Sequence, residues 1–529
     1  MEPYTNSEEE RILIVGAGPT GLVLALCLTQ LGVKIRVIDR AKEAGTTSRA
    51  IGVHARTLEF YRQLGLAQEV VASGIRTAAA NLWVKGAKAA RIPLAELGEG
   101  LTAFPYVLMY PQDEHEKFLI GKLAEAGVRV ERSTELIGFT QEAGCVRAIL
   151  GLPGGGRESF EAAFLAGCDG ASSTVRHALP TEFPGGTYSH LFYVADVEAS
   201  GPPTDNEVHI DLEDSEFLGV FPLTRKGHVR VIGSIRDEIA GRRETLKFDD
   251  VRGYALRNMR LEASRENWFS TYRVHHRVAR DFRKGRVFLL GDAAHVHSPV
   301  GAQGMNTGIG DAVNLSWKLA AVLRRGADDA ILDTYGAERI AFAKRLVATT
   351  DRVFTFATNR SALVVALRRV LIPFLVPRIL ASRLKSSVFR TFSQIGIRYR
   401  SSALAEGSAG GVHGGDRLPW FQSPAGEDNH ATLAGLAWRV HVYGDMPEGI
   451  RGACEEMNLS LHHFEWQAGM KDAGLVAGGL YLVRPDGYVA LADARCTPSR
   501  LRGYFRERRM AASLQAAPAP MAFPAPGHR

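Results

Sequence analysis

The sequence predicts an α/β protein with a discontinuous Rossmann-like nucleotide-binding domain, a β-sheet domain inserted into it, and a further α/β domain at the carboxyl end. Two segments, 11–39 and 285–323, each combine a short apolar strand, a glycine turn and a helix. Between them, residues 181–274 alternate apolar and polar side chains, which is typical of an antiparallel sheet. A chain of 529 residues is also too long for a single hydrophobic core.

The first of these segments predicts a dinucleotide-binding turn. A strand (RILIV), a glycine turn (GAGPTG), a helix and a second strand (KIRVID) follow one another between residues 11 and 39. Gly16 permits the tight turn, Gly18 lets the backbone approach a pyrophosphate, and Gly21 allows close packing of helix on strand. Asp39 ends the second strand at the spacing expected of a ribose-binding acid. The cofactor-binding residues predicted here are Gly16, Gly18, Pro19, Thr20, Gly21, Asp39 and Arg40.

The second segment places a carboxylate at the end of another strand. Residues 287–290 are apolar and end at Gly291-Asp292, and the carboxyl ends of strands are where open α/β sheets bind ligands. After a loop rich in Gly, Pro and Ser, a helix begins near residues 304–307, and its amino-terminus attracts anions. Gly-Asp alone fits an ordinary βα unit, but the complete run favours a ligand site.

The two segments together favour FAD as the bound dinucleotide. The chain contains one βαβ fingerprint, and NAD bound to it would leave the distant Gly291-Asp292 element unexplained. FAD is longer and held more tightly, so it requires both. NAD(P)H is therefore expected as a transient co-substrate. The sequence leaves open whether NADPH or NADH is used.

Three further polar residues are weaker candidates. Arg49 follows a glycine-containing loop and on its own would be a surface cation. Gln112 stands before a helix, where an amide can both donate to and accept from a ligand, although an ordinary helix-terminal role is equally compatible. Asp169, in the run CDGASSTVR that ends at Arg176, lies where a strand passes into a helix and could contact a phosphate or the cofactor loop.

The strand-rich middle of the chain predicts a substrate chamber. Strands are expected at 192–197, 208–212, 217–222 and 229–235, and a sheet laid over a cofactor encloses an apolar site for a small molecule. The predicted boundaries are 1–180 and 275–350 for the FAD-binding domain, whose first part also contributes to the substrate-side sheet, 181–274 for the substrate-binding sheet domain, 351–402 for a helical segment, 403–515 for the C-terminal domain and 516–529 for a disordered tail.

Composition narrows the partners and the compartment. The net charge of +7 and pI near 9.1 come from basic residues spread along the chain, which favours a small anionic cofactor over nucleic acid. Five scattered cysteines without C-x-x-C predict neither disulfides nor a metal site, which fits the cytoplasm. The acidic residues 1–11 predict no signal peptide, and arginines and prolines within 362–381 argue against an integral membrane segment. A homodimer stays open.

Three motifs in this chain resemble the signatures of the FAD-dependent aromatic hydroxylases, the group A flavoprotein monooxygenases. They are GAGPTG with Asp39, CDGASSTVR, and GDAAHVHSPVGAQGMNTGIGDAVNLSWKLA, and the likeness covers about residues 11–350. It implies reduction of FAD by NAD(P)H, capture of O2 as a flavin hydroperoxide, and hydroxylation of an aromatic small molecule, phenolic or polycyclic and polyketide-like.

The resemblance also assigns roles to single residues. Arg49 and Gln112 would contact the flavin or its ribityl chain, and Asp292 a ribityl hydroxyl. Arg49 and Pro299, the latter beside the isoalloxazine, are the two residues expected to act in catalysis. The remaining implied cofactor contacts are the backbone of Leu136 at the adenine, Asp169, and the backbone of Gly304, Met305 and Asn306 at the flavin pyrimidine. Ala302 replaces the more usual glycine, a minor departure.

The carboxyl-terminal part resembles the thioredoxin-like domain of the phenol hydroxylase and polyketide hydroxylase branch. Without C-x-x-C it has no dithiol chemistry, so a structural or dimer-related role is expected. The glycine-rich residues 403–415 are interpreted as a linker.

Two other functions are compatible with the same fold. A flavin-dependent halogenase or saturase is the enzymatic alternative, and the halogenase W-x-W-x-I-P signature is missing. A flavin-free binding protein is the other, and the intact glycine and acid motifs speak against it. The sequence identifies neither the substrate nor a catalytic base, although Tyr272, His275 and His276 lie at the return to the FAD domain.

Overall fold

The computed structural model describes residues 11–45, 50–84, 86–211, 217–235, 245–298, 301–358, 361, 364, 374, 378, 382 and 384–510. Arg49, Pro299, the predicted tail 516–529 and most of the apolar run 362–381 lie outside the described residues. No helix among the described residues is long and apolar enough to cross a membrane.

A six-stranded sheet of order β18-β19-β12-β1-β2-β8 forms the core of the nucleotide-binding domain. Its strands are β18 (Arg283–Lys284), β19 (Val287–Leu289), β12 (Phe164–Gly167), β1 (Ile12–Val15), β2 (Ile35–Asp39) and β8 (Val130–Arg132). All neighbours from β19 to β8 are parallel, and β18 is antiparallel. The chain leaves β1 toward β2 on one side and returns through β12 on the other, so the sheet has a topological switch point beside β1.

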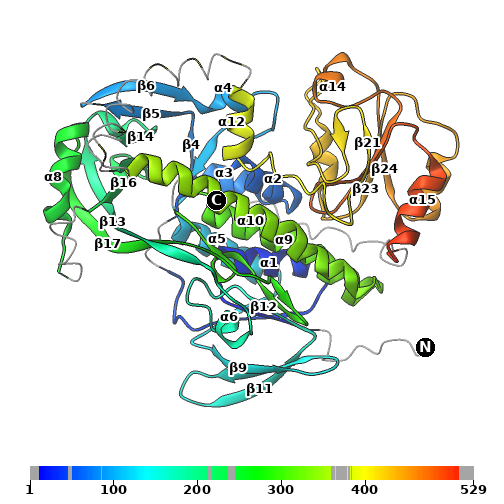
Figure 1. The fold of residues 1–529 in the computed structure, drawn as a ribbon, viewed down its shortest axis with the longest axis horizontal. Helices are drawn as coiled ribbons and strands as arrows, with labels where there is room; N and C mark the ends of the chain where they lie inside the picture. The colour runs from blue at the N-terminus through cyan, green and yellow to red at the C-terminus, as the bar shows by residue number, and fades with distance from the viewer. Residues whose placement is uncertain are drawn as a thin grey trace.

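Helices cover one face of this sheet and a small meander covers the other (Figure 1). The helical face contains α1 (Pro19–Gln30), α5 (Gln112–Glu125), α9 (Gly304–Arg325) and α10 (Asp333–Thr358), and the opposite face contains α6 (Thr174–Ala178), β9 (Glu135–Gln141), β10 (Val146–Gly151) and β11 (Arg157–Ala162). α1 is buried on nearly all sides because it packs between the sheet, α5 and α9, which explains its almost wholly apolar sequence.

The inserted sheet has eight strands in the order β20-β17-β13-β16-β15-β14-β5-β6. They are β20 (His295–Val296), β17 (Glu262–Val278), β13 (Gly185–Ser200), β16 (His228–Ser234), β15 (Leu218–Pro222), β14 (Val208–Asp211), β5 (Ala79–Val84) and β6 (Ala87–Pro93). The strands expected in 192–235 are present. The last two strands of this sheet, β5 and β6, come from the first part of the chain. One face packs on α8 (Phe248–Met259) through Tyr193, Val197 and their neighbours.

Short elements connect the two sheets. The remaining strands and helices of this half are β3 (Gly52–Val53), β4 (Ile75–Thr77), β7 (Val107–Met109), α2 (Ala55–Gln63), α3 (Ala67–Ser73), α4 (Leu94–Gly98) and α12 (Lys385–Phe392). Phe389 and Ile395, from the predicted helical segment, are buried against Leu97 and Val107, so that segment helps to close the region between the sheets.

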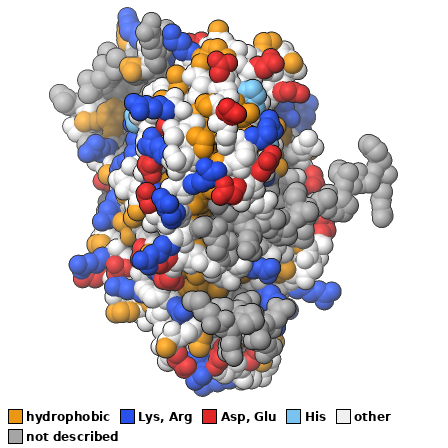
Figure 2. Space-filling model, turned by 90° about the vertical axis from the view of Figure 1, so that its right-hand side faces the viewer, with side chains coloured by type: hydrophobic (Ala, Val, Ile, Leu, Met, Phe, Trp, Pro, Cys, Tyr) orange, Lys and Arg blue, Asp and Glu red, His pale blue; other side chains and the backbone are white. Residues whose placement is uncertain are grey.

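The C-terminal domain is a separate mixed α/β layer (Figure 1). Its sheet order is β22-β21-β26-β25-β23-β24, formed by β22 (Val412–His413), β21 (Glu406–Ala409), β26 (Val489–Asp493), β25 (Gly479–Val483), β23 (Arg439–Tyr443) and β24 (Ser460–Phe464). Its helices are α13 (Ile450–Glu456), α14 (Ala468–Asp472) and α15 (Pro498–Glu507). On the face drawn in Figure 2, basic and acidic side chains are interspersed, as their spread along the sequence predicts.

The interpretation of 403–415 as a linker is wrong. β21 and β22 belong to the C-terminal sheet, and β21 pairs with β26 in parallel. The glycines there let two backbone segments lie close together, since a Cβ on Gly414 would overlap the backbone of Glu406. Glycine enrichment thus reflects a compact edge hairpin in this case.

A buried ion pair fastens the C-terminal domain to α2. The Arg417 guanidinium donates to both carboxylate oxygens of Glu59, and both side chains are 5% exposed. Arg56 Nη1 and Thr102 Oγ1 donate to the same carboxylate, at 2.8 and 2.6 Å. Burial opposes ionisation of Glu59, but Arg417 and Arg56 hold its pKa well below the usual range.

Arg417→Met is expected to lower the free energy of unfolding by about 3 kcal/mol, because it leaves a buried carboxylate short of a partner. Arg91→Met, which breaks a partly exposed pair with Glu207, should cost less than about 1 kcal/mol. Urea unfolding of both variants measures the difference, and equal midpoints would contradict the role assigned to Arg417.

Candidate functional site

The three sequence motifs meet at the carboxyl edge of the six-stranded sheet. Gly16 has φ +105°, and a Cβ there would overlap the carbonyl of Cys168 in the second motif. A Cβ on Gly291 would lie 2.7 Å from the Thr20 hydroxyl, and one on Gly308 would collide with the same hydroxyl. The first and third motifs are therefore in direct contact, and several of their glycines are required by packing within the protein.

Gly18 differs from these glycines. Its φ of −78° suits any residue, and a Cβ there would meet nothing within 4 Å. The space in front of α1 is thus open on the side of Gly18, at a helix amino-terminus with no acidic residue in its first turn. This is the arrangement that accommodates a pyrophosphate.

Asp39 closes the loop that precedes α1. Its Oδ2 accepts from the amide of Ala17 at 2.7 Å, its Oδ1 accepts from the amide of Ala41 at 2.8 Å, and Arg132 lies 3.7 Å away. The side chain keeps 18% of its surface exposed, so the carboxylate can also accept from a ligand hydroxyl. Arg40, the next residue, is exposed.

Asp292 lies on a short 3-10 turn, η3 (Gly291–Ala293), that follows β19. Its neighbours Gly291 and Ala293 are buried, whereas Asp292 is exposed at the carboxyl edge of the sheet. Gly291 has φ +57°, a conformation that favours glycine. The turn therefore presents the Asp292 carboxylate on the same sheet edge as Asp39.

A second acid, Asp311 on α9, holds this turn from below. Its Oδ2 accepts from the amide of Gly291 at 3.0 Å and from Nε2 of His295 at 2.7 Å, and its Oδ1 accepts from Nε of Arg339 at 2.5 Å. Asp311 and Arg339 are each 1% exposed. Although burial opposes its ionisation, Arg339 and His295 lower the pKa of Asp311.

The first turn of α9 faces the same region. Among the described residues no side chain caps this helix start. The Asn306 side chain accepts from the amide of His54 at 2.9 Å and donates to the carbonyls of Gly52 and Ala302 at 2.9 and 2.8 Å. It thereby fixes the start of α9 to β3 and leaves the backbone as the group available to a ligand.

Two residues shape the loop before α9. The His54 ring donates from Nε2 to the carbonyl of Gly301 at 2.8 Å, and burial lowers the pKa of His54 to about 4. Ala302 has φ +52°, so its backbone has the left-handed conformation that glycine adopts more easily. The alanine at position 302, where glycine is more usual, therefore adopts the backbone conformation that a glycine would have.

The remaining predicted residues lie near this edge with different roles. Gln112 begins α5 and donates to Glu116 at 2.7 Å, while its backbone amide donates to the carbonyl of Ala50. The Asp169 carboxylate accepts from the hydroxyl of Ser173, which is the N-cap of α6, and from the amide of Val175, so it stabilises the start of that helix. Leu136 is buried in β9, Thr20 and Pro19 begin α1, and Gly304 and Met305 are partly buried at the start of α9. Contacts of these residues with a cofactor stay predictions.

Sequence reasoning missed Asp311 as a functional residue. The available signal is a stripe of polar residues, Asp311, Asn314 and Lys318, on a helix whose other positions are largely apolar. These three share one face and are 1%, 2% and 0% exposed. Buried polar residues at helical spacing indicate a paired internal network.

Comparison with known proteins places this fold among FAD-binding proteins. Residues 9–350 match the family described as "FAD binding domain". A 6-methylpretetramide 4-monooxygenase from Streptomyces rimosus is 33% identical over 510 residues, 92% of this chain and 91% of that protein. The chain belongs to this FAD-binding family and is an FAD-dependent monooxygenase that uses NAD(P)H.

Solved structures share the complete architecture. The OxyS anhydrotetracycline hydroxylase from Streptomyces rimosus aligns with a TM-score of 0.75 at 27% identity, over 94% of this chain and 98% of that chain. Aklavinone-11 hydroxylase, in a ternary complex with FAD and aklavinone, aligns with a TM-score of 0.79 at 26% identity, over 96% and 100%. Both alignments extend through the C-terminal domain.

Gly18→Val should weaken FAD binding by about 5- to 150-fold, since an overpacked contact costs about 1–3 kcal/mol, while the apoprotein unfolds nearly as before. Gly21→Ala should instead destabilise the apoprotein, because its Cβ would overlap the Gly16 carbonyl. FAD titration and thermal unfolding of each apoprotein separate the two effects. Unimpaired FAD binding by Gly18→Val would show that the space beside it serves no ligand.

Proposed function

We propose that this monooxygenase hydroxylates a polycyclic aromatic compound, phenolic and of polyketide type, with NAD(P)H and O2 as co-substrates. The observation that carries this proposal is an aromatic face of the inserted sheet that continues toward the start of α9. The hydroxylases with which the chain aligns throughout act, by their names, on 6-methylpretetramide, anhydrotetracycline and aklavinone.

The aromatic face follows from the strand register. Phe192 and Tyr272 are cross-strand partners with ring centroids 6.0 Å apart, and Val194 stands beside Ile232. Phe217, Phe221 and Trp268 pack around this cluster. Such a surface buries planar apolar rings without requiring a charged substrate.

One ion pair interrupts this face. Arg230 donates from Nε and Nη2 to Asp196 at 2.7 and 2.8 Å, and from Nη1 to the carbonyl of Ala50 at 3.1 Å. Arg230 is 1% exposed. The pair therefore connects the sheet to the segment after residue 49. The Asp196 carboxylate keeps 21% of its surface exposed, so it is the group on this face that would orient a substrate hydroxyl.

Ile51 lies between the aromatic face of the inserted sheet and the carboxyl edge of the six-stranded sheet. It packs in the cluster that contains Phe389 and the partly buried Phe221 and Phe392. Phe392 lies edge-on to His54, with ring centroids 4.6 Å apart. Together these side chains place apolar walls between the sheet and the loop before α9, where exclusion of water favours productive oxygen transfer.

The residues of the sheet edge would hold FAD in extended form. Gly18 and the start of α1 would bind the pyrophosphate, Asp39 the adenosine ribose, and Asp292 a ribityl hydroxyl. The backbone of Gly304, Met305 and Asn306 would donate to the flavin pyrimidine, where the helix dipole stabilises negative charge. FAD, when bound, accepts hydride from NAD(P)H and activates O2.

The three side chains considered as bases have other partners. Tyr272 packs in the aromatic cluster, His275 hydrogen-bonds with Thr187 at 2.7 Å, and the His276 ring lies 4.6 Å from that of Tyr188. We assign none of them to proton transfer. The side chains around the aromatic face would contribute to catalysis by orienting the aromatic ring of the substrate and by excluding water from it.

Cellular context is part of the proposal. Five free cysteines, four of them buried, suit a reducing compartment, and we infer that the enzyme works in the cytoplasm. Homodimerisation stays a prediction.

The FAD-loaded protein should oxidise NAD(P)H faster in the presence of polycyclic phenols than of simple phenols, because only the larger rings fill the aromatic face. NAD(P)H consumption and product mass, measured with isotopically labelled O2, provide the test. The product should gain one labelled oxygen atom. Asp292→Ala is the matched control: losing a charged acceptor should weaken FAD binding by about 1.5–3 kcal/mol and reduce the signal in parallel.

Stimulation without oxygen in the product would contradict hydroxylation. A preference for halide-dependent products would favour the halogenase alternative, and a protein that cannot be loaded with FAD would favour the binding-protein alternative.

A further inference from the structure

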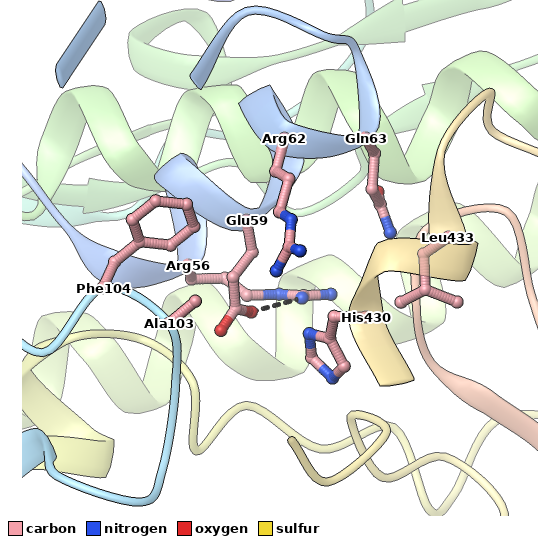
Figure 3. Close-up of a pocket in the computed structure, with 8 residues that line it drawn as sticks. All are labelled: Arg56, Glu59, Arg62, Gln63, Ala103, Phe104, His430 and Leu433. Carbon is pink, nitrogen blue, oxygen red and sulfur yellow. Dashed lines mark hydrogen bonds and ion pairs between the residues drawn. The ribbon is translucent and has the colours of Figure 1, made fainter. Parts of the chain in front are cut away.

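A tight turn of the C-terminal domain reaches into the FAD-binding domain. β25 and β26 are joined by residues 484–488, closed by a hydrogen bond from the Arg484 amide to the Tyr488 carbonyl at 2.8 Å. Gly487 has φ +75°, and a Cβ there would lie 2.9 Å from Nε2 of Gln63 on α2. Figure 3 shows the same contact region, with Arg56, Glu59 and Gln63 of α2 facing His430 and Leu433 of the C-terminal domain.

Asp486, at the tip of this turn, bonds to α9. Its Oδ2 accepts from Nε1 of Trp317 at 3.2 Å and from Nδ2 of Asn314 at 3.4 Å, and its backbone carbonyl accepts from Nη2 of Arg56 at 2.6 Å. Asp486 is 1% exposed. The turn therefore contacts α2 and α9 through groups that all lie away from water.

Arg484 extends the contact to α10. It donates to both carboxylate oxygens of Glu338, at 2.7 and 3.0 Å, and to both oxygens of Asp486. Lys318 of α9 donates to Glu338 at 2.9 Å. These four side chains are at most 1% exposed, and their two positive and two negative charges cancel.

This network lies next to Asp311 and Arg339, which hold the Gly291–Asp292 turn and the start of α9 at the carboxyl edge of the six-stranded sheet. Asn314, which contacts Asp486, lies one turn after Asp311 on α9, and Arg339 follows Glu338 on α10. Arg339 donates to Asp311, to the carbonyl of Thr307 at 3.0 Å, and to the Tyr399 hydroxyl at 2.8 Å. The Tyr399 ring in turn packs on Tyr488 of the hairpin, with centroids 4.4 Å apart.

A buried ion network adds little to the free energy of folding. Desolvation offsets most of its attraction, and well-packed apolar side chains of similar volume hold two domains together equally well. Hydrogen-bonded charges differ from apolar contacts because they fix direction and register. Here the register concerns α9 and α10, the two helices that supply Asp311, Arg339 and the first turn of α9.

We propose that Asp486 and Arg484 of the C-terminal domain are positioning residues for the flavin site. They hold α9 against α10 in the one register that places the Gly291–Asp292 turn and the start of α9 together at the sheet edge. The C-terminal domain is thereby a part of the cofactor site at a distance. This inference rests on the assignment of FAD to that edge under the proposed function.

A double-mutant cycle on FAD affinity tests the proposal. Asp486→Asn keeps the shape but removes the charge, and Trp317→Phe removes the indole donor that meets Asp486. Each should raise the dissociation constant of FAD on the order of tenfold, the usual size of coupling between sites. The double variant should bind FAD no more weakly than the weaker single variant, since both act through one contact.

The visible circular dichroism of bound FAD is the second readout. A shifted register of α9 should change these bands in both single variants, whereas loss of stability alone would not. Glu456→Gln is the control, because Glu456 pairs with Arg502 on the exposed side of the same domain. It should match the wild type in both measurements.

Four outcomes separate the hypotheses. Wild-type FAD affinity and dichroism in both single variants, even with lower melting temperatures, would overturn the positioning role. Additive losses in the double variant would overturn a shared route through Trp317. If Asp486→Asn does not fold, Trp317→Phe alone decides the dichroism test. Failure of Asp292→Ala to weaken FAD binding would instead reject the cofactor assignment itself.

Discussion

The arrangement of the carboxyl edge of the six-stranded sheet depends on the hydrogen bonds that Asp311 accepts. A single buried carboxylate accepts from the backbone of one glycine turn, from His295 after that turn, and from Arg339 of α10. Without it, the Gly291 amide and a guanidinium would be buried without a charged partner, at a cost of several kcal/mol. Asp311 therefore decides where Asp292 and the start of α9 stand relative to each other.

The same arrangement explains why the three motifs must meet although they lie far apart in sequence. Gly16 packs against the backbone of Cys168, and Thr20 fills the space left by Gly291 and Gly308. Each contact requires the absence of a side chain, so the site is assembled mainly from close backbone approach. The open space at Gly18 is the exception, and it lies on the path proposed for the pyrophosphate.

Much of the fold could be predicted from local sequence patterns. The strands around Asp39 and Gly291 and the helix from Gly304 follow from apolar periodicity and turn chemistry, and the alternation in 181–274 indicated the inserted sheet. Interactions between distant segments could not be predicted in this way. Nothing near Asp311 in the sequence names Arg339 as its partner, and nothing near Asp486 names Trp317, because such pairs arise only when helices pack.

Composition also misled in one place. The glycines of 403–415 suggested a linker, since glycine at high density is typical of loops, but there they allow an edge hairpin to approach its neighbours. Of the predicted site residues, Asp169 has a local role at the start of α6, where it accepts from the Val175 amide, and the carboxylate of Asp39 already accepts from two backbone amides. Side-chain roles of this kind depend on distances that sequence spacing does not contain.

The FAD affinity of Asp311→Asn tests the central claim most directly. An amide at this position cannot accept from Gly291, His295 and Arg339 together, so FAD should bind about 5- to 150-fold more weakly, as expected for a coupling of about 1–3 kcal/mol. Asp333→Asn, an exposed acid at the start of α10 that pairs with Arg283, should bind FAD like the wild type. Equal affinity in both variants and the wild type would contradict the account.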